Sequence, residues 1–291
     1  ARAAATAATR PRRVGDSRPR TNVSSRRRLV VRHERRAEDD GYRSALAPGL
    51  RSSEDARRLA EEIGFADARL ATLAAEPPGL YAEIASEADP EEAAWLAFLV
   101  VYLGPLEEAD PFAAIAAVRC PWGSLPDLAQ ARVGPRGAHD AARGTATVEA
   151  YVRFAERAGS QAGAIGGDPA WTAEQRFERA HERLALPGLR GRARYDLLVT
   201  LGVLGRHPLV APSLLVVDDD PVTVAAKRIF GIGDRMTLES RAKRLASAVG
   251  SPVAALDLGI ENWARSERIT QGVPAADGVA AGERALAALG L

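Results

Sequence analysis

Residues 183–194 read Arg-Leu-Ala-Leu-Pro-Gly-Leu-Arg-Gly-Arg-Ala-Arg, and this stretch decides how the rest of the chain is interpreted. Residues that can form a buried face recur at helical spacing on both sides of it: Phe177, Ala180, His181 and Leu184 before it, and Leu197, Leu198, Leu201 and Leu204 after it. Thr172 and Gln175 form a capping box ahead of the first set. The pattern predicts two helices, over about 172–185 and 192–204, joined by a short glycine turn, with His181 on the packed face.

The same helical periodicity extends over most of the chain. A first helix is predicted behind a cap at Ser52 or Ser53, ending at Gly64. Asp-Pro and Ser-Pro pairs mark further helix starts, because proline suits the first turn and the preceding side chain can cap it. The remaining predicted helices span 90–103, 111–118, 147–158, 221–230, 237–249 and 252–265. The best strand candidate is 213–217, and one short strand cannot form a sheet. The expected fold is therefore all-α, a multi-helix bundle.

Charge divides the chain unevenly. Residues 1–36 carry twelve arginines against Asp16 and Glu34, without apolar periodicity. Residues 1–45 are expected to be a disordered Arg-rich segment, or sequence upstream of the true start, and a basic nucleic-acid-binding tail is the alternative. Residues 46–291 form the expected helical region, as one domain or two subdomains.

Composition narrows the classes of protein. The longest strongly apolar run, 95–103, is about half of what would span a bilayer, so no membrane association is expected. One cysteine rules out an intramolecular disulfide framework, and a cytoplasmic location fits. The four histidines are too scattered for a metal pair at helical spacing, so neither a metal nor a cofactor is expected.

The glycine turn could bind an anion. Backbone amides at the start of the second helix are free, and the helix dipole favours negative charge there. The predicted phosphate-binding residues are Pro187, Gly188, Leu189, Arg190, Gly191, Arg192 and Arg194. Glycine turns between helices also occur in many folds that never bind nucleic acid.

Residues 186–198, Leu-Pro-Gly-Leu-Arg-Gly-Arg-Ala-Arg-Tyr-Asp-Leu-Leu, resemble the Leu-Pro-Gly-x-Gly hairpin of the helix-hairpin-helix DNA glycosylases, the endonuclease III-like superfamily. The resemblance continues through Val217-Asp218-Asp219-Asp220, which precedes a predicted helix carrying Arg228, and covers about 170–266. In this family such an aspartate stabilises the sugar cation formed when the N-glycosidic bond breaks. The resemblance implies a glycosylase-like bundle with a central helix-hairpin-helix, acting on a damaged or modified base in double-stranded DNA.

The aspartates do not have equal claims. The spacing to Arg228 favours Asp219 or Asp218 as the catalytic carboxylate, and Asp219 is the preferred residue. Asp220, directly before Pro221, is expected to cap the helix. The alternative is that all three form a solvated acidic turn. Lys227 and Arg228 belong to a basic segment, 227–244, which could flank DNA or be a solvated helix face.

The sequence departs from the family at three points, one of which is that Gly104-Pro105-Leu106 replaces the polar Gln-containing turn that fills the gap left by a flipped base. There is one residue more than usual between the two hairpin glycines, and no lysine occupies the positions near Ala193 and Arg194 where bifunctional members carry their amine nucleophile. The resemblance therefore implies a monofunctional glycosylase, without a strand-nicking step. The rival hypotheses are a non-catalytic helix-hairpin-helix module that binds DNA or RNA, and a helical protein with no nucleic-acid role.

Overall fold

The computed structural model describes residues 37–217, 220–274 and 277–291. Within them the regular elements are twelve α-helices and one 3-10 turn, with no β-strand, so the all-α fold class is confirmed. The predicted segment 1–45 lies mostly outside the described residues. Its described part, from residue 37, runs without regular secondary structure to the first helix, and there Tyr42 donates a hydrogen bond to the carbonyl of Leu289 (2.7 Å).

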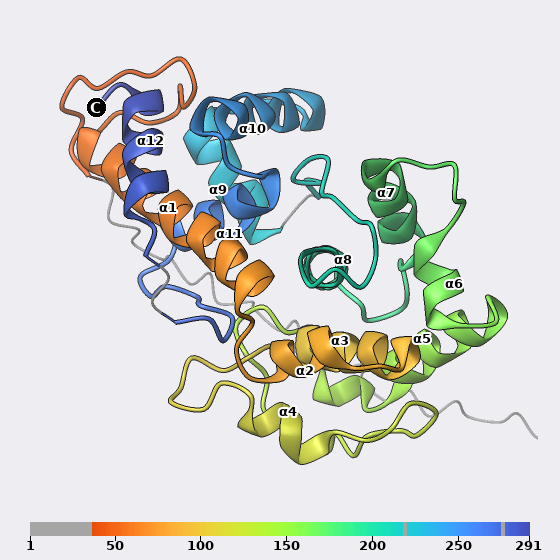
Figure 1. Cartoon of the computed structure of the whole chain (residues 1–291). Helices are drawn as coiled ribbons and strands as arrows, with labels where there is room; N and C mark the ends of the chain where they lie inside the picture. The colour runs from red at the N-terminus through yellow and green to blue at the C-terminus, as the bar shows by residue number, and fades with distance from the viewer. Residues whose placement is uncertain (1–36, 218–219, 275–276) are drawn as a thin grey trace, which may run out of the picture. The chain divides into compact units, whose positions relative to one another are not determined.

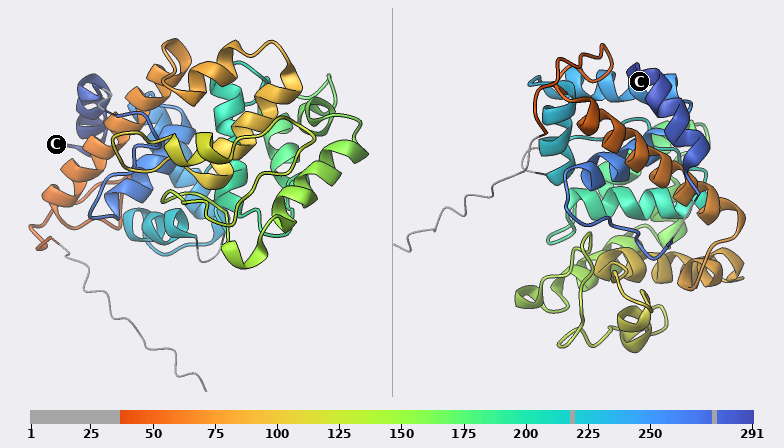
Figure 2. Two further views of the ribbon diagram at one scale, coloured as in Figure 1. Left: turned by 90° about the horizontal axis from the view of Figure 1, so that it is seen from below. Right: turned by 90° about the vertical axis from the view of Figure 1, so that its left-hand side faces the viewer.

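The helices follow one another from Ser53 to the C-terminus. They are α1 (Ser53–Ala75), α2 (Leu80–Ser86), α3 (Pro90–Leu103), α4 (Ala113–Val118), η1 (Ala141–Arg143), α5 (Ala146–Arg157), α6 (Gln161–Gly166), α7 (Ala173–Arg183), α8 (Gly191–Val203), α9 (Pro221–Phe230), α10 (Arg235–Val249), α11 (Val253–Trp263) and α12 (Val279–Leu289). Figures 1 and 2 show α1 packed between α11 and α12, and α4 at the opposite end of the described helices from α10.

Two hydrophobic clusters hold these helices. One gathers α3, α5, α7 and α8 around buried aromatic side chains such as Trp95, Phe98 and Tyr151. The other gathers α9, α10 and α12 around residues such as Phe230 and Leu245. Helices α1 and α11 contribute side chains to both clusters. Because α8 belongs to the first and α9 to the second, the segment between them crosses from one to the other.

The first predicted helix end is wrong. Helix α1 continues past Gly64 to Ala75, because Gly64 is a point of close helix contact rather than a stop. A Cβ built on Gly64 would lie 2.5 Å from the Gly278 carbonyl oxygen and 2.8 Å from the amide nitrogen of Gly282. The absence of a side chain lets the backbone of α12 approach α1.

Several predicted caps form and others do not. The Thr172–Gln175 capping box and the Asp89 cap of α3 are both present. The Asp110-Pro111 and Ser251-Pro252 pairs lie ahead of α4 and α11, but these helices begin at Ala113 and Val253, and Ser251 Oγ is buried without a partner among the described residues. The candidate strand 213–217 is irregular, with Leu215 at a φ of 47°. Helices α2, α6 and α12 were not expected from the sequence.

Candidate functional site

The connection between α7 and α8 spans residues 184–190 and packs against α5. Gly188 has a φ of +84°, a conformation that favours glycine. A Cβ at this position would also lie 2.1 Å from the hydroxyl oxygen of Thr147 on α5. Leu189 is buried beside it. The second glycine of the motif, Gly191, is the first residue of α8 and needs no positive φ.

Two side chains fasten the end of α7 to the start of α8. The ring Nε2 of His181 lies 3.1 Å from the Gly191 carbonyl oxygen, and Arg194 Nη1 donates to the His181 carbonyl (2.9 Å). Burial and the charge of Arg194 lower the pKa of His181 to about 4. His181 is therefore neutral at pH 7, and since a carbonyl only accepts, Nε2 carries the proton. The predicted burial of His181 is confirmed.

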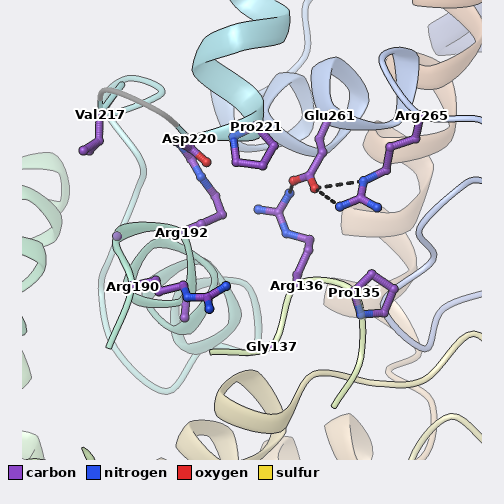
Figure 3. A pocket seen from close by; sticks show the side chains of 12 residues that line it. Pro135, Arg136, Gly137, Arg190, Arg192, Val217, Asp220, Pro221, Glu261 and Arg265 are labelled. Atoms are coloured by element: carbon purple, nitrogen blue, oxygen red, sulfur yellow. Dashed lines mark hydrogen bonds and ion pairs between the residues drawn. The ribbon is translucent and has the colours of Figure 1, made fainter. Parts of the chain in front are cut away.

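A cavity of about 490 Å³ opens between α8, α9 and α11 (Figure 3). Its walls come from the N-terminal residues of α8 and α9, from one face of α11 and from the loop before η1. The lining residues are Pro135, Arg136, Gly137, Arg190, Gly191, Arg192, Ala193, Val217, Asp220, Pro221, Glu261 and Arg265. Four residues predicted to bind phosphate or to be candidate catalytic carboxylates thus line one cavity: Arg190, Gly191, Arg192 and Asp220.

Asp220 stands at the N-cap position of α9, as its place before Pro221 predicts, but its side chain makes no capping hydrogen bond. It forms an ion pair with Arg192 on α8 instead, and both side chains are nearly buried. This contact joins the start of α9 to the start of α8. Asp218 and Asp219 lie outside the described residues, so their assignment stays a prediction.

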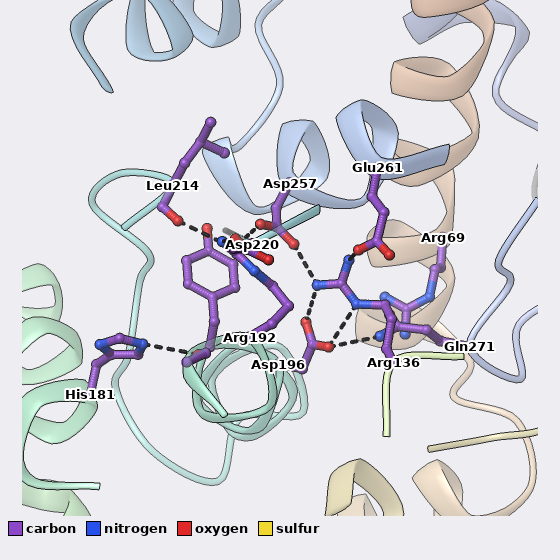
Figure 4. A network of polar contacts seen from close by, with 12 residues as sticks. Arg69, Arg136, His181, Arg192, Asp196, Leu214, Asp220, Asp257, Glu261 and Gln271 are labelled. Atoms are coloured by element: carbon purple, nitrogen blue, oxygen red, sulfur yellow. Dashed lines mark hydrogen bonds and ion pairs between the residues drawn. The ribbon is translucent and has the colours of Figure 1, made fainter. Parts of the chain in front are cut away.

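A buried network of charges forms the floor of the cavity (Figure 4). At its centre the Arg136 guanidinium donates to Asp196 (2.7 and 2.8 Å), Asp257 (2.6 Å) and Glu261 (2.6 Å), and its side chain is 3% exposed. Arg136 comes from the loop before η1, Asp196 from α8 and the other two carboxylates from α11. One arginine therefore ties three segments together.

Asp257 connects this arginine to the cavity wall. Its second carboxylate oxygen forms an ion pair with Arg192, which also donates to the Leu214 carbonyl (3.2 Å). Burial raises the pKa of Asp257 to about 6, against the opposite pull of the Arg192 and Arg136 guanidiniums. Arg136 thus pairs with Asp257, Asp257 with Arg192, and Arg192 with Asp220. These ion pairs fix the position of the Asp220 carboxylate.

The three arginines predicted to bind phosphate make different contacts. Arg192 is committed to two carboxylates, and Arg194 is directed to the end of α7. Arg190 is exposed and makes no hydrogen bond or ion pair with another described residue. At the N-cap of α8 it provides no side-chain cap. The first-turn amides of α8 and the Arg190 guanidinium are thus the groups at this wall that can receive an anion.

Lys227 and Arg228 lie on α9 and are half-buried; neither lines the cavity. The Arg228 guanidinium carbon lies 4.8 Å from the centre of the Trp263 ring, so the arginine packs on α11. These two residues form a separate part of the surface.

Sequence reasoning missed Arg136, Asp196, Asp257 and Glu261. A signal existed on α11, where Asp257 and Glu261 stand four residues apart, one inside and one directly after the apolar run Leu256 to Ile260. Carboxylates on the buried side of a helix require cationic or hydrogen-bonding partners. The sequence could not show that this partner is Arg136, because Arg136 lies 121 residues from Asp257 in the chain.

Within the described ranges, no three side chains of His, Cys, Asp or Glu gather as metal ligands would, and no helix is long and apolar enough to cross a membrane. Comparison with known proteins found no matching family model, no similar curated protein and no similar solved structure.

Proposed function

We propose that this protein is a monofunctional DNA N-glycosylase that hydrolyses the bond between the sugar and a damaged or modified base in double-stranded DNA. The observation that carries the proposal is the shared cavity: Asp220 and the N-terminal turn of α8 line the same space of about 490 Å³. That volume lies in the range of small-molecule sites and is large enough for one nucleotide. A base must leave the duplex stack before an enzyme can act on its glycosidic bond.

The two walls suit the two ends of such a nucleotide. A phosphate would bind at the free amides of Gly191 to Ala193, where the α8 dipole and Arg190 both favour negative charge. The sugar would then face the start of α9, which Asp218, Asp219 and Asp220 precede in the sequence. As the bond breaks, the base leaves with the bonding electrons, C1′ becomes cationic, and a nearby carboxylate stabilises it until water adds and loses a proton.

Asp219 remains the proposed carboxylate for this step, on the strength of the sequence resemblance. Asp220 has a different role in the proposal, because its ion pair with Arg192 engages the carboxylate. Asp220 would position the start of α9. Among the residues that line the cavity there is no lysine, which agrees with base removal without an amine attack on the sugar.

The decisive experiment measures base release from duplexes carrying uracil, alkylated bases or oxidised bases. We expect the wild type to release at least one class, Asp219→Asn to lose roughly 100-fold or more in rate, and the exposed control Asp127→Asn to match the wild type. Asp220→Asn should lower rate and thermal stability together, because it leaves Arg192 with one carboxylate partner fewer. Release unaffected by Asp219→Asn would overturn the assignment of that residue, and no release from any duplex would overturn the glycosylase proposal.

One observation favours the second candidate, a helix-hairpin-helix module that binds DNA or RNA without catalysis. The two described carboxylates that line the cavity, Asp220 and Glu261, are both held in ion pairs with arginines, so neither is free to stabilise a sugar cation. Salt-sensitive binding of a duplex without base release would identify this candidate.

A further inference from the structure

The turn between α9 and α10 presents the two most exposed large apolar side chains of the described residues. Ile232 is 95% exposed and Met236 is 81% exposed. Ile232 stands between Gly231, which has a φ of +80°, and Gly233, at the tip of the connection. Met236 follows in the first turn of α10. Apolar side chains exposed to this degree at one tip indicate a binding surface.

The charge around this tip is positive. Residues 227–244 contain six basic and two acidic side chains, a net charge of +4. The acidic residues are engaged locally: Asp234 caps α10 through the Thr237 amide (2.8 Å), and Glu239 pairs with Arg235 (2.9 Å). Lys243 and Arg244 are exposed on α10. A polyanion therefore complements this surface.

The tip is also close to the proposed nucleic-acid site. Helix α9 begins at Pro221, on the cavity wall, and ends at Phe230, just before Ile232. Ten helical residues span roughly 15 Å, or about four base-pair steps of DNA.

We propose that Ile232, supported by Met236, inserts into the base stack or minor groove of duplex DNA while exposed basic side chains of α10, Lys243 and Arg244, contact the flanking phosphates. Proteins that distort DNA use such an apolar side chain flanked by cations. The inference rests on the proposed function for its partner, DNA, but concerns a surface outside the cavity. Segment 1–36 is a poor occupant of this surface, because its twelve arginines carry the same sign of charge.

The test compares wild type, Ile232→Ala and Leu125→Ala in binding to one duplex that carries 2-aminopurine. Leu125 is a matched control because it is also an exposed aliphatic residue (52%) and lies beside Val118 of α4. Helix α4 stands at the opposite end of the described helices from α10 (Figure 1). We expect Ile232→Ala to weaken binding about tenfold or more, as for the loss of a fully buried isoleucine, and to abolish the rise in 2-aminopurine fluorescence on binding. Leu125→Ala should change neither.

The outcomes separate this inference from the proposed function. Base release with unchanged binding by Ile232→Ala would refute the role of Ile232 and leave the glycosylase proposal standing. Binding that depends on Ile232 without base release would support the inference and refute the glycosylase. A wild type that does not bind duplex DNA, or that forms a dimer lost in Ile232→Ala, would refute the inference.

Discussion

Removing the Arg136 guanidinium tests the role of the buried charge network. Arg136→Met keeps much of the side-chain volume and deletes the cation shared by Asp196, Asp257 and Glu261. Four charge-assisted hydrogen bonds are lost. Each carboxylate keeps another partner, because Asp257 retains Arg192, Glu261 retains Arg265 and Asp196 retains Gln271. The expected loss in the free energy of unfolding is therefore about 3–5 kcal/mol, as for other broken buried pairs.

Chemical and thermal unfolding of the purified protein measure this loss. For a chain of this size, 3–5 kcal/mol corresponds to a fall in Tm of roughly 10 °C. The matched control is Arg132→Met, which removes an ion pair to Glu108 in which both side chains are about half exposed. It should cost far less than Arg136→Met, because an exposed ion pair contributes little to stability.

The pH dependence separates charge from packing. Burial raises the pKa of Asp257 above its unfolded value of 3.8, so the folded state favours the protonated acid, and the associated stability is lost as pH rises through about 6. Removal of Arg136 should strengthen this effect. The difference between wild type and Arg136→Met should then be largest at pH 7 and shrink toward pH 5. A difference that is constant with pH, or no larger than that of Arg132→Met, would refute the reasoning.

Three further predictions concern the connection between α7 and α8. Burial lowers the pKa of His181 from 6.5 to about 4, so its contribution to stability is present above pH 6.5 and is lost as the pH falls toward 4. In denaturant titrations, the stability advantage of the wild type over His181→Gln should therefore decrease by up to about 3 kcal/mol across that window. A stability difference that does not change with pH would contradict the burial argument. Gly188→Ala should destabilise the protein more than Gly159→Ala. Both glycines have a positive φ, so either substitution costs about 1 kcal/mol in backbone strain, but only at Gly188 does a Cβ meet another side chain. Equal Tm values of the two variants would refute the steric contact. Arg190→Gln should weaken duplex binding equally for all sequences and lower the salt slope by about 1, whereas Arg132→Gln should not, and a sequence-selective loss would show that Arg190 contacts bases instead.

The sequence predicted best the helices with a clear start signal or a regular apolar stripe. The bounds of α3 and α9 were obtained to the residue, because each begins at an Asp-Pro pair and ends before a glycine, and those of α10 within two residues, because its apolar residues form a stripe. Helices α2 and α6 have seven and six residues, too few to show a period. The helix end predicted at Gly64 was wrong because the sequence does not distinguish a glycine that ends a helix from a glycine that lets a neighbouring backbone approach.

The candidate site was predictable only in part, for a related reason. A turn motif and an Asp-Pro pair are local signals, so Arg190, Gly191 and Asp220 could be named in advance. Which side chains their charges meet depends on contacts between residues far apart in the chain, and the arginine count gave no indication that Arg136 and Arg192 are neutralised internally. The charge of an arginine in a buried ion pair is compensated by its carboxylate partner, and the pair fixes the positions of the two side chains. An exposed arginine keeps its charge in contact with solvent, where it can bind a phosphate. Arg192 and Arg190 are two residues apart and differ in this respect, so we expect any affinity of the cavity for an anion to depend on Arg190 and the α8 amides, and its shape to depend on Arg192.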